Sequence, residues 1–475
     1  MVIVGDANGL IIPELPPVAG RKLRGLRLLH TRLGSSLLNQ EDLTDMLFLR
    51  LDGVIVLTVS ELGEPEKWQW ASLAADSSDS PYLISSSFPW HENSCDLVER
   101  LETENIAAPV SKNGARRAFL VSVSNEPRFV QERNLKELGE LAKTAGLEVG
   151  GELCQRVQTP HPSYILGKGK LAELEILALN ADAEILIFDG ELNPAQLNNL
   201  AEITRRKVLD RTQLILDIFA GRASSKAGKL QAELAQLAYN QPRLTGRHKA
   251  LDRLMGGVGG RGPGESRLET DRRKIRDRMT FLKRELDKIR KRRASARAAR
   301  ERNGIPVCSL VGYTNAGKST LLNILTSSSI YTADSHFATL DPTTRRLRFP
   351  KERSIVLSDT VGFIRNLPRE LIDAFRATLE ELDMADLLLL VADAADDEAF
   401  LRIEAVKATL EELGLDKKKT ILVFNKIDLL SMDKKYVLRE EFPDAVFVSA
   451  KSGESLEILL NRIERELFEP GDDDE

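Results

Sequence analysis

The sequence is poor in cysteine and has no long apolar run. Its 475 residues include three cysteines, Cys95, Cys154 and Cys308, which stand far apart and fit neither a metal-site nor a disulfide spacing. The richest apolar run, LLLLVA at 387–392, has the length of one buried strand rather than the ~18 residues that a membrane span needs. The start, MVIVGDANG, has neither the basic nor the apolar region of a secretory signal. We therefore expect a cytoplasmic protein with reduced thiols and no stable membrane insertion.

The sequence also lacks a dominant charge of one sign. Its net charge of −5 argues against a uniformly basic nucleic-acid binder, although it does not describe local patches. The length is too great for a single hydrophobic core. The patterns along the chain predict an N-terminal extension of unknown role, an α/β domain, a helical hairpin with a glycine-rich tip, a second α/β domain and an acidic tail, at 1–112, 113–225, 226–302, 303–468 and 469–475.

The first half of the chain alternates between strand-like and helix-like segments. Residues 1–110 mix short apolar runs with a serine-rich stretch and predict a small α/β module. The pattern is clearer from a strand at 117–123, which is followed by a helical stretch and by a second strand at 183–190. The next helix has Asn193 as its cap and Pro194 at its first position. This alternation predicts a parallel or mixed α/β sheet.

Two helices of a different character follow. The segment 228–244 places leucines on one face, and a second helix, 267–302, carries apolar residues at intervals of seven with two more on the adjoining edge. These residues are Leu230, Leu234 and Leu237 in the first helix, and Leu268, Ile275, Leu282 and Ile289 with Met279 and Leu286 in the second. We predict an antiparallel pair whose tip is GGVGGRGPGE, at 256–265.

The second predicted helix is strongly basic. Residues 267–302 contain sixteen Lys or Arg against six Asp or Glu, a local balance of +10 in a chain of −5. A basic helix face is usually only solvated, and charge alone favours that interpretation. Segregation this strong nevertheless raises the nucleic-acid interpretation, because clustered cations neutralise phosphates.

A phosphate-binding loop follows the hairpin. Residues 306–320, PVCSLVGYTNAGKST, give a strand, then Gly312-x-x-x-x-Gly317-Lys318-Ser319, and then a helix. Small residues let backbone N–H groups close around phosphates, Lys318 neutralises the β and γ oxygens, and the Ser319 hydroxyl ligates Mg²⁺. The flanking strand and helix make a chance match to this pattern unconvincing.

Three further motifs come in order, each at the end of a predicted strand. Asp359-Thr360-Val361-Gly362 supplies a carboxylate that holds Mg²⁺ through water and an N–H that senses a γ-phosphate. Asn425-Lys426-Ile427-Asp428 supplies a carboxylate for N1–H and the 2-amino group of guanine, which adenine lacks as a pair. Ser449-Ala450-Lys451 offers backbone groups to the guanine O6. Together the motifs predict a GTPase rather than an ATPase.

The segments around these motifs refine the prediction. HFATLDPTTRR, at 336–346, is the expected first switch, and Thr339, rather than Thr343 or Thr344, is its expected Mg²⁺ ligand. Phe363 stands where many GTPases have a glutamine that orients water, which predicts slow intrinsic hydrolysis.

The predicted site has catalytic, metal and nucleotide-binding parts. The catalytic residues are Lys318, Thr339 and Gly362, and the Mg²⁺ ligands are Ser319 and Thr339 directly and Asp359 through water. The nucleotide-binding residues are Gly312, Tyr313, Thr314, Asn315, Ala316, Gly317, Lys318, Ser319, Thr320, Phe337, Ala338, Thr339, Asp359, Thr360, Val361, Gly362, Asn425, Lys426, Asp428, Ser449, Ala450 and Lys451.

The order of these motifs resembles the HflX family of ribosome-associated GTPases. The most specific matches are GRGPGE at 260–265 and LETDRR at 268–273, and YILGKGKL, FDGELNPAQLNNL and DRTQLILDIFAGRA upstream also resemble the family. The resemblance runs from about Arg117 to Phe468. Departures are small: Gly260 stands where threonine is common, and Ser266-Arg267 where Thr-Gln is usual.

The resemblance implies an architecture and a role. It implies an α/β HflX domain, a projecting helical hairpin and a Ras-like P-loop domain in a monomer. It also implies binding to the large ribosomal subunit and its rRNA, and splitting of stalled or stressed ribosomes, with GTP favouring the bound state and hydrolysis accompanying release. The hairpin residues expected at rRNA are Gly260, Arg261, Gly262, Arg272 and Arg273. ATP hydrolysis is also known in the family, but NKID gives no physical support for adenine.

Two alternatives remain from the residues. One is a regulatory GTPase switch that acts on protein or membrane partners, although Phe281 is the only aromatic residue from 266 to 302. The other is a zinc hydrolase in residues 1–110, because HTRLGSSLLNQED (30–42) distantly resembles the H-x-H-P and S-x-x-D pattern of JAMM metalloproteases. Arg32, Leu33 and Asn39 replace the second histidine, the proline and the serine, so we expect chance or a metal-free relic.

Overall fold

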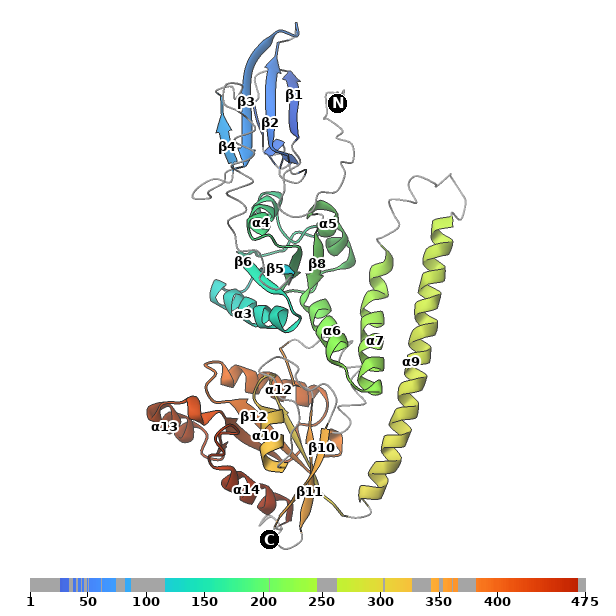
Figure 1. Cartoon of the computed structure of the whole chain (residues 1–475), viewed down its shortest axis with the longest axis vertical. Coiled ribbons are helices and arrows are strands. Elements are labelled where there is room, and N and C mark those ends of the chain that lie inside the picture. The colour runs from blue at the N-terminus through green and yellow to red at the C-terminus, as the bar shows by residue number, and fades with distance from the viewer. Residues whose placement is uncertain are drawn as a thin grey trace. The chain divides into compact units, whose positions relative to one another are not determined.

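The structure is a computed structural model of the chain (Figure 1). The chain divides into two compact units, residues 1–211 and 212–475. It describes residues 26–33, 37–39, 42–43, 45–46, 49, 51–60, 62–73, 82–86, 116–204, 206–245, 263–301, 304–326, 343–349, 353–360, 362–365 and 382–468. Within these residues no helix is both long enough and apolar enough to cross a membrane.

The N-terminal sheet has four strands in the order β1-β2-β3-β4. They are β1 (Arg27–Leu33), β2 (Gly53–Val59), β3 (Pro65–Leu73) and β4 (Tyr82–Ser85). β1 runs parallel to β2, and the other pairs are antiparallel. Met46, Val54 and Ala71 are fully buried against it, so a small core forms on one face. The predicted α/β module therefore contains a mixed sheet.

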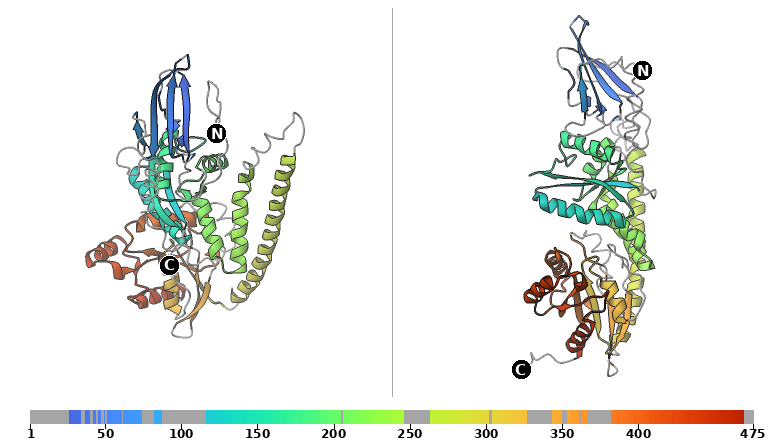
Figure 2. Two further views of the ribbon diagram at one scale, coloured as in Figure 1. Left: turned by 45° about the horizontal axis from the view of Figure 1, so that its top comes forward. Right: turned by 60° about the vertical axis from the view of Figure 1, so that its left-hand side comes forward.

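The second sheet is wholly parallel, in the order β6-β5-β7-β8. Its elements are β5 (Arg117–Ser124), α3 (Arg128–Thr144), β6 (Glu148–Arg156), α4 (Lys168–Asn180), β7 (Ile185–Phe188), α5 (Pro194–Thr204) and β8 (Lys207–Asp210). α3 covers one face, and α4 and α5 cover the other (Figure 2). Asn193 Oδ1 accepts from the Gln196 N–H at 2.8 Å and Gln196 Oε1 accepts from the Asn193 N–H at 3.1 Å, a reciprocal cap that starts α5 where the sequence predicted.

The hairpin consists of α7 (Lys226–Asn240) and α9 (Pro263–Glu301), preceded by α6 (Arg211–Arg222) and joined through η2 (Pro242–Thr245). Arg278 donates to both carboxylate oxygens of Glu233, at 2.7 and 2.9 Å, and Lys226 pairs with Glu285 at 3.3 Å. From Lys226 to Glu233 the chain advances seven residues along α7, while their partners go back seven residues along α9, from Glu285 to Arg278. The two helices are therefore antiparallel. The predicted start of α9 at 267 is four residues late, because Pro263 suits the first turn of a helix.

The seam of this hairpin is short. Among the described side chains of α9, 269–292, Leu282 is fully buried, and Ile275, Met279, Leu286 and Ile289 are partly buried. The 39 residues of α9 span ~58 Å and the 15 of α7 only ~22 Å at 1.5 Å per residue. Much of the longer helix therefore extends past its partner. The predicted tip residues 256–262 and the side chain of Leu268 lie outside the described residues.

The last domain is a six-stranded sheet in the order β10-β11-β9-β12-β13-β14, parallel except for β10. Its elements are β9 (Val307–Gly312), α10 (Lys318–Thr326), β10 (Thr343–Arg348), β11 (Ser354–Asp359), β12 (Leu387–Asp393), α12 (Ala399–Glu412), β13 (Thr420–Asn425), η3 (Ile427–Leu429), α13 (Met432–Glu441), β14 (Val446–Phe447) and α14 (Leu456–Phe468).

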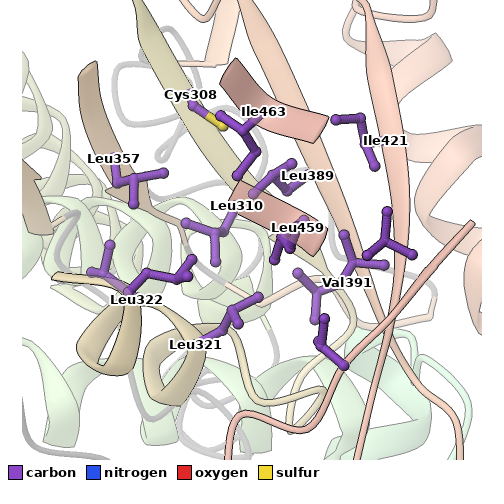
Figure 3. Packing of buried hydrophobic residues seen from close by; sticks show 14 of the residues in the cluster. Cys308, Leu310, Leu321, Leu322, Leu357, Leu389, Val391, Ile421, Leu459 and Ile463 are labelled. Carbon is purple, nitrogen blue, oxygen red and sulfur yellow. The ribbon is translucent and has the colours of Figure 1, made fainter. Parts of the chain in front are cut away.

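The core of this domain lies between the sheet and two helices. Leu310 of β9 and Leu389 of β12 meet Leu321 of α10 and Leu459 of α14, and all four are fully buried (Figure 3). Because β9, β11 and β13 run parallel, their carboxyl ends reach one edge of the sheet. The sequence motifs that follow these strands therefore converge there.

Candidate nucleotide site

The loop after β9 requires glycine at two positions. Gly312 has φ +152° and Gly317 has φ +88°, a backbone conformation that L side chains rarely adopt. A Cβ on Gly312 would lie 2.2 Å from the Val391 carbonyl oxygen, and one on Gly317 would lie 2.3 Å from Asn425 Nδ2. The loop therefore packs directly against β12 and against the loop after β13.

Lys318 is enclosed by this loop. Its ammonium donates to the carbonyl oxygens of Gly312 at 3.0 Å and Tyr313 at 2.8 Å, and the residue is 6% exposed. Burial lowers the pKa of Lys318 to about 8, against the opposing effect of the Asp359 charge. A buried cation whose hydrogen bonds go to neutral carbonyls keeps its charge available to an incoming anion.

Ser319 and Asp359 form the expected metal corner. The Ser319 hydroxyl donates to Asp359 Oδ2 at 2.6 Å, and the Thr360 N–H donates to Asp359 Oδ1 at 2.9 Å. Thr360 Oγ1 donates in turn to the Leu310 carbonyl at 2.7 Å, which fixes the chain after β11 to β9. Hydroxyl and carboxylate oxygens are the donors that Mg²⁺ prefers, so these two side chains fit that ion.

The chain after Asp359 folds onto the phosphate-binding loop. The Phe363 N–H donates to the Gly312 carbonyl at 3.0 Å, and the Thr314 N–H donates to the Phe363 carbonyl at 2.8 Å. A Cβ on Gly362 would lie 3.1 Å from Lys318 Nζ, so this glycine reaches the buried cation. The Phe363 ring is 3% exposed and packs inside the domain. Val361 and the predicted first-switch residues 337–339 lie outside the described residues.

The two remaining motifs are joined by Asn425. Its Nδ2 donates to the Ala316 carbonyl at 3.0 Å, and its Oδ1 accepts from the Ala450 N–H at 2.9 Å. Ser449 Oγ donates to Asp428 Oδ1 at 2.6 Å, which anchors an exposed carboxylate. This carboxylate suits the donor pair of guanine. The Ala450 N–H, one of the backbone groups of residues 449–451 predicted to meet the guanine O6, donates to Asn425 in this structure.

Sequence reasoning missed two contacts of the site. Lys426 has a left-handed backbone, φ +65°, and its ammonium pairs with Asp393 at the end of β12 at 2.7 Å. Tyr313 Oη accepts the Arg365 N–H at 2.9 Å. Lys426 and Asp393 are 33 residues apart in the sequence, and Tyr313 and Arg365 are 52 apart, so no local sequence pattern predicts either contact.

Of the five hairpin residues expected at rRNA, two lie within the described part of the chain. Arg273 is exposed and Arg272 partly exposed on α9, whereas 260–262 lie outside the described residues. Five exposed cations of this helix have no acidic partner among the described residues. They are Arg273, Arg276, Lys283, Arg284 and Arg292.

Three family models match the chain in succession. The model described as GTP-binding GTPase N-terminal matches residues 132–220, the GTP-binding GTPase Middle Region matches 222–300, and the 50S ribosome-binding GTPase matches 307–426. The GTPase HflX of Caldanaerobacter subterraneus subsp. tengcongensis is 48% identical over 352 residues, covering 74% of this chain and 81% of that protein. The GTPase HflX of Escherichia coli is 44% identical over 344 residues, covering 71% and 81%. The chain belongs to the HflX family of GTPases.

Solved structures include similar GTP-binding proteins. The complex of SsGBP with GDP covers 74% of this chain and 98% of that chain at 28% identity and a TM-score of 0.42. A GTP-binding protein from Sulfolobus solfataricus, also with GDP, covers 74% and 98% at 27% identity and a TM-score of 0.40. As an HflX GTPase, the chain is a GTP hydrolase with a P-loop domain, as the sequence predicted.

The matches to family models begin at residue 132, and the N-terminal sheet lies before them. There, His30 Nε2 lies 3.1 Å and Arg32 Nη2 3.0 Å from Asp42 Oδ1, and Arg32 Nη1 donates to the Leu37 carbonyl at 2.9 Å. Burial raises the pKa of Asp42, but the hydrogen bonds from His30 and the Asn39 N–H and the charge of Arg32 outweigh it and lower the pKa. His30, Arg32 and Asp42 therefore meet in space, but Arg32 is no metal ligand, and among the described residues no three or more His, Cys, Asp or Glu side chains lie together as a metal site would need.

Proposed function

We propose that this GTPase binds the large ribosomal subunit through its helical hairpin and separates stalled or stressed ribosomes into subunits, with GTP hydrolysis coupled to release. The observation that carries the proposal is the exposed cationic surface of α9, much of which extends past α7. Such a surface suits an RNA backbone, because each phosphate neutralised by Lys or Arg releases counterions. The match of residues 307–426 to the family model of 50S ribosome-binding GTPases supports the same partner.

We propose a role for each residue of the nucleotide site. Lys318 offsets the charge on the β- and γ-phosphates, and the Gly362 N–H, next to that cation, meets the γ-phosphate. Ser319 would hold Mg²⁺ directly and Asp359 through water, with Thr339 as the first-switch ligand. Mg²⁺ supplies charge neutralisation during phosphoryl transfer. Asp428 selects guanine by accepting from N1–H and the 2-amino group.

Hydrolysis is proposed to be slow without a partner. Phe363 is buried and apolar, so its side chain cannot orient a water molecule as a glutamine does. Single-turnover hydrolysis of bound GTP by the isolated protein tests this point. A rate as fast as that of a glutamine-bearing GTPase would contradict it.

The covalent path from α9 to the site supports coupling between them. Five residues separate the end of α9 at Glu301 from the start of β9 at Val307, and β9 leads directly into the phosphate-binding loop. A change in the loop on nucleotide exchange is therefore passed to a strand that is almost continuous with the RNA-binding helix. The proposed cytoplasmic location follows from the ribosome as partner.

Light scattering of assembled ribosomes tests the proposal. Scattering is expected to fall on addition of the protein with GTP or a non-hydrolysable analogue, and less with GDP. Arg272→Glu/Arg273→Glu and, separately, Arg261→Ala are expected to impair splitting while GTP binding is kept. Lys417→Glu/Lys419→Glu is the matched control, because it reverses two exposed lysines on the loop before β13. No loss of scattering in any nucleotide state would overturn the proposal.

A switch acting on protein or membrane partners is the second candidate. It would leave ribosome scattering unchanged and show nucleotide-dependent binding to anionic vesicles or to protein. Along the described side chains of α9 the exposed surface is cationic, with Phe281 as its exposed aromatic residue, and it lacks the broad apolar face of a membrane-surface helix. The ribosome is therefore the better supported partner.

A further inference from the structure

Tyr313 is a large side chain at a position of the phosphate-binding loop that directly follows its first glycine. The residue is 6% exposed, and its backbone carbonyl is one of the two acceptors of the Lys318 ammonium. Its hydroxyl and its ring each contact a different segment of the domain. These contacts are separate from the phosphate-binding role of the loop.

The hydroxyl of Tyr313 fixes the chain that follows Gly362. It accepts the Arg365 N–H at 2.9 Å, beyond the two backbone hydrogen bonds that pair Phe363 with Gly312 and Thr314. Three hydrogen bonds thus join residues 363–365 to residues 312–314. The bonds of Phe363 on one side of Gly362 and of Thr360 on the other also hold this glycine near Lys318, and the hydroxyl of Tyr313 adds a further tie.

The ring of Tyr313 is held from the side of α12. The guanidinium carbon of Arg402 lies 4.9 Å from the ring centroid, and Arg402 Nε lies 2.8 Å from Asp396 Oδ2. Asp396 Oδ1 accepts the Glu398 N–H at 3.0 Å, at the start of α12. The ring is therefore placed by a cation that is itself held by a carboxylate in the turn before α12.

We infer that Tyr313 is a positioning residue for GTP hydrolysis, which holds Gly362 at the γ-phosphate through its hydroxyl and is itself oriented by Arg402 and Asp396. Gly362 is the group that distinguishes GTP from GDP, because GDP has no γ-phosphate. The tyrosine therefore acts on the hydrolytic step and hardly on GDP binding. The inference rests on the proposed phosphate site, and it does not depend on ribosome binding.

Tyr313→Phe tests the hydroxyl, because it keeps the ring and its contact with Arg402. Loss of one hydrogen bond in the positioning of Gly362 is expected to lower the single-turnover rate about 2- to 10-fold. GDP affinity, measured with a fluorescent GDP analogue, and the melting temperature are expected to stay at wild-type values. Tyr436→Phe is the matched control, since Tyr436 is exposed on α13. An unchanged rate, or an equal loss of GDP affinity, would overturn the inference.

Arg402→Gln tests the orientation of the ring. It is expected to lower the rate less than Tyr313→Phe, and the double variant is expected to be no slower than Tyr313→Phe alone, because both changes act through one hydroxyl. Rates that multiply in the double variant would show that Arg402 acts separately. If Lys318→Ala bound nucleotide normally, the phosphate site itself would be wrong, which distinguishes that failure from a failure of the tyrosine.

Discussion

Two small clusters in this chain combine a cation with an aspartate, and they differ in what the cation contacts. In the N-terminal sheet, the Arg32 guanidinium lies 3.0 Å from Asp42, so the two charges satisfy each other. In the P-loop domain, the Lys318 ammonium donates to two neutral carbonyls, while Asp359 takes its hydrogen bonds from Ser319 and Thr360. In the first cluster the cation is paired with the aspartate, whereas in the second the cation is bonded to neutral groups beside the two side chains proposed to hold Mg²⁺. Residue types alone do not separate the two; their partners do.

Removing the Lys318 cation should have the largest effect. Lys318→Ala deletes the ammonium proposed to face the β- and γ-phosphates, and we expect nucleotide affinity to fall at least ~100-fold, because charge-assisted hydrogen bonds to two phosphates are lost at ~1.5–3 kcal/mol each. Titration with a fluorescent GDP analogue measures it. Lys407→Ala, an exposed lysine of α12, is the control and should bind as the wild type does. Affinity within threefold of wild type for Lys318→Ala would contradict the assignment.

Changing the exposed carboxylate of the site should have the next largest effect. Asp428→Asn replaces an acceptor for both N1–H and the 2-amino group by an amide, and we expect ~10- to 100-fold weaker GDP binding. Xanthosine diphosphate, which carries a carbonyl in place of the 2-amino group, should bind the variant better than it binds the wild type. Competition titrations compare the two bases. Equal losses for both would mean that Asp428 supports the loop and does not recognise the base.

The sequence predicted that these motifs follow strands of one parallel sheet, because the signals for them are local. Each motif follows a strand that an apolar run in the sequence predicts. Because these strands run parallel, their ends bring Lys318, Asp359 and Asn425 to one edge of the sheet. The contacts that escaped prediction are long-range. Tyr313 reaches Arg365 and Arg402 across 52 and 89 residues, and periodicity carries no record of such pairs. The early start of α9 was missed for a different reason, since Pro263 was assigned to a loop although it also suits a first helical turn.

The Lys318 cation should also make binding depend on pH. Lys318 has a pKa of about 8 in the free protein, and bound phosphates favour its charged form and raise that value. Nucleotide affinity should therefore be constant below pH ~8 and fall by up to ~10-fold per unit above it. Titrations from pH 7 to 9 measure this slope. Lys318→Arg, whose side chain does not titrate there, removes the lysine contribution, and an identical slope in that variant would assign the effect to another group.

Substitutions in the cluster of His30, Arg32 and Asp42 should have the smallest effect on nucleotide binding and hydrolysis. One of them, however, should make the cluster able to bind a metal ion. His30 and Arg32 stand two residues apart on β1, so their side chains lie on the same face of the strand. Arg32→His would therefore add a second imidazole beside Asp42, and His30, the new histidine and Asp42 would be the three protein ligands that a zinc site needs. We expect this variant to retain about one more zinc ion per chain than the wild type after dialysis, by elemental analysis. The control variant is Arg32→Met, because it removes the guanidinium without adding a ligand.

The Arg32→Met variant should retain no additional zinc. Its N-terminal sheet should lose about 1–3 kcal/mol of stability, since Asp42 loses its cation. GTP hydrolysis should be unchanged in both. If Arg32→His holds no more zinc than Arg32→Met, the cluster lacks the geometry of a metal site, and its likeness to one extends only to residue order.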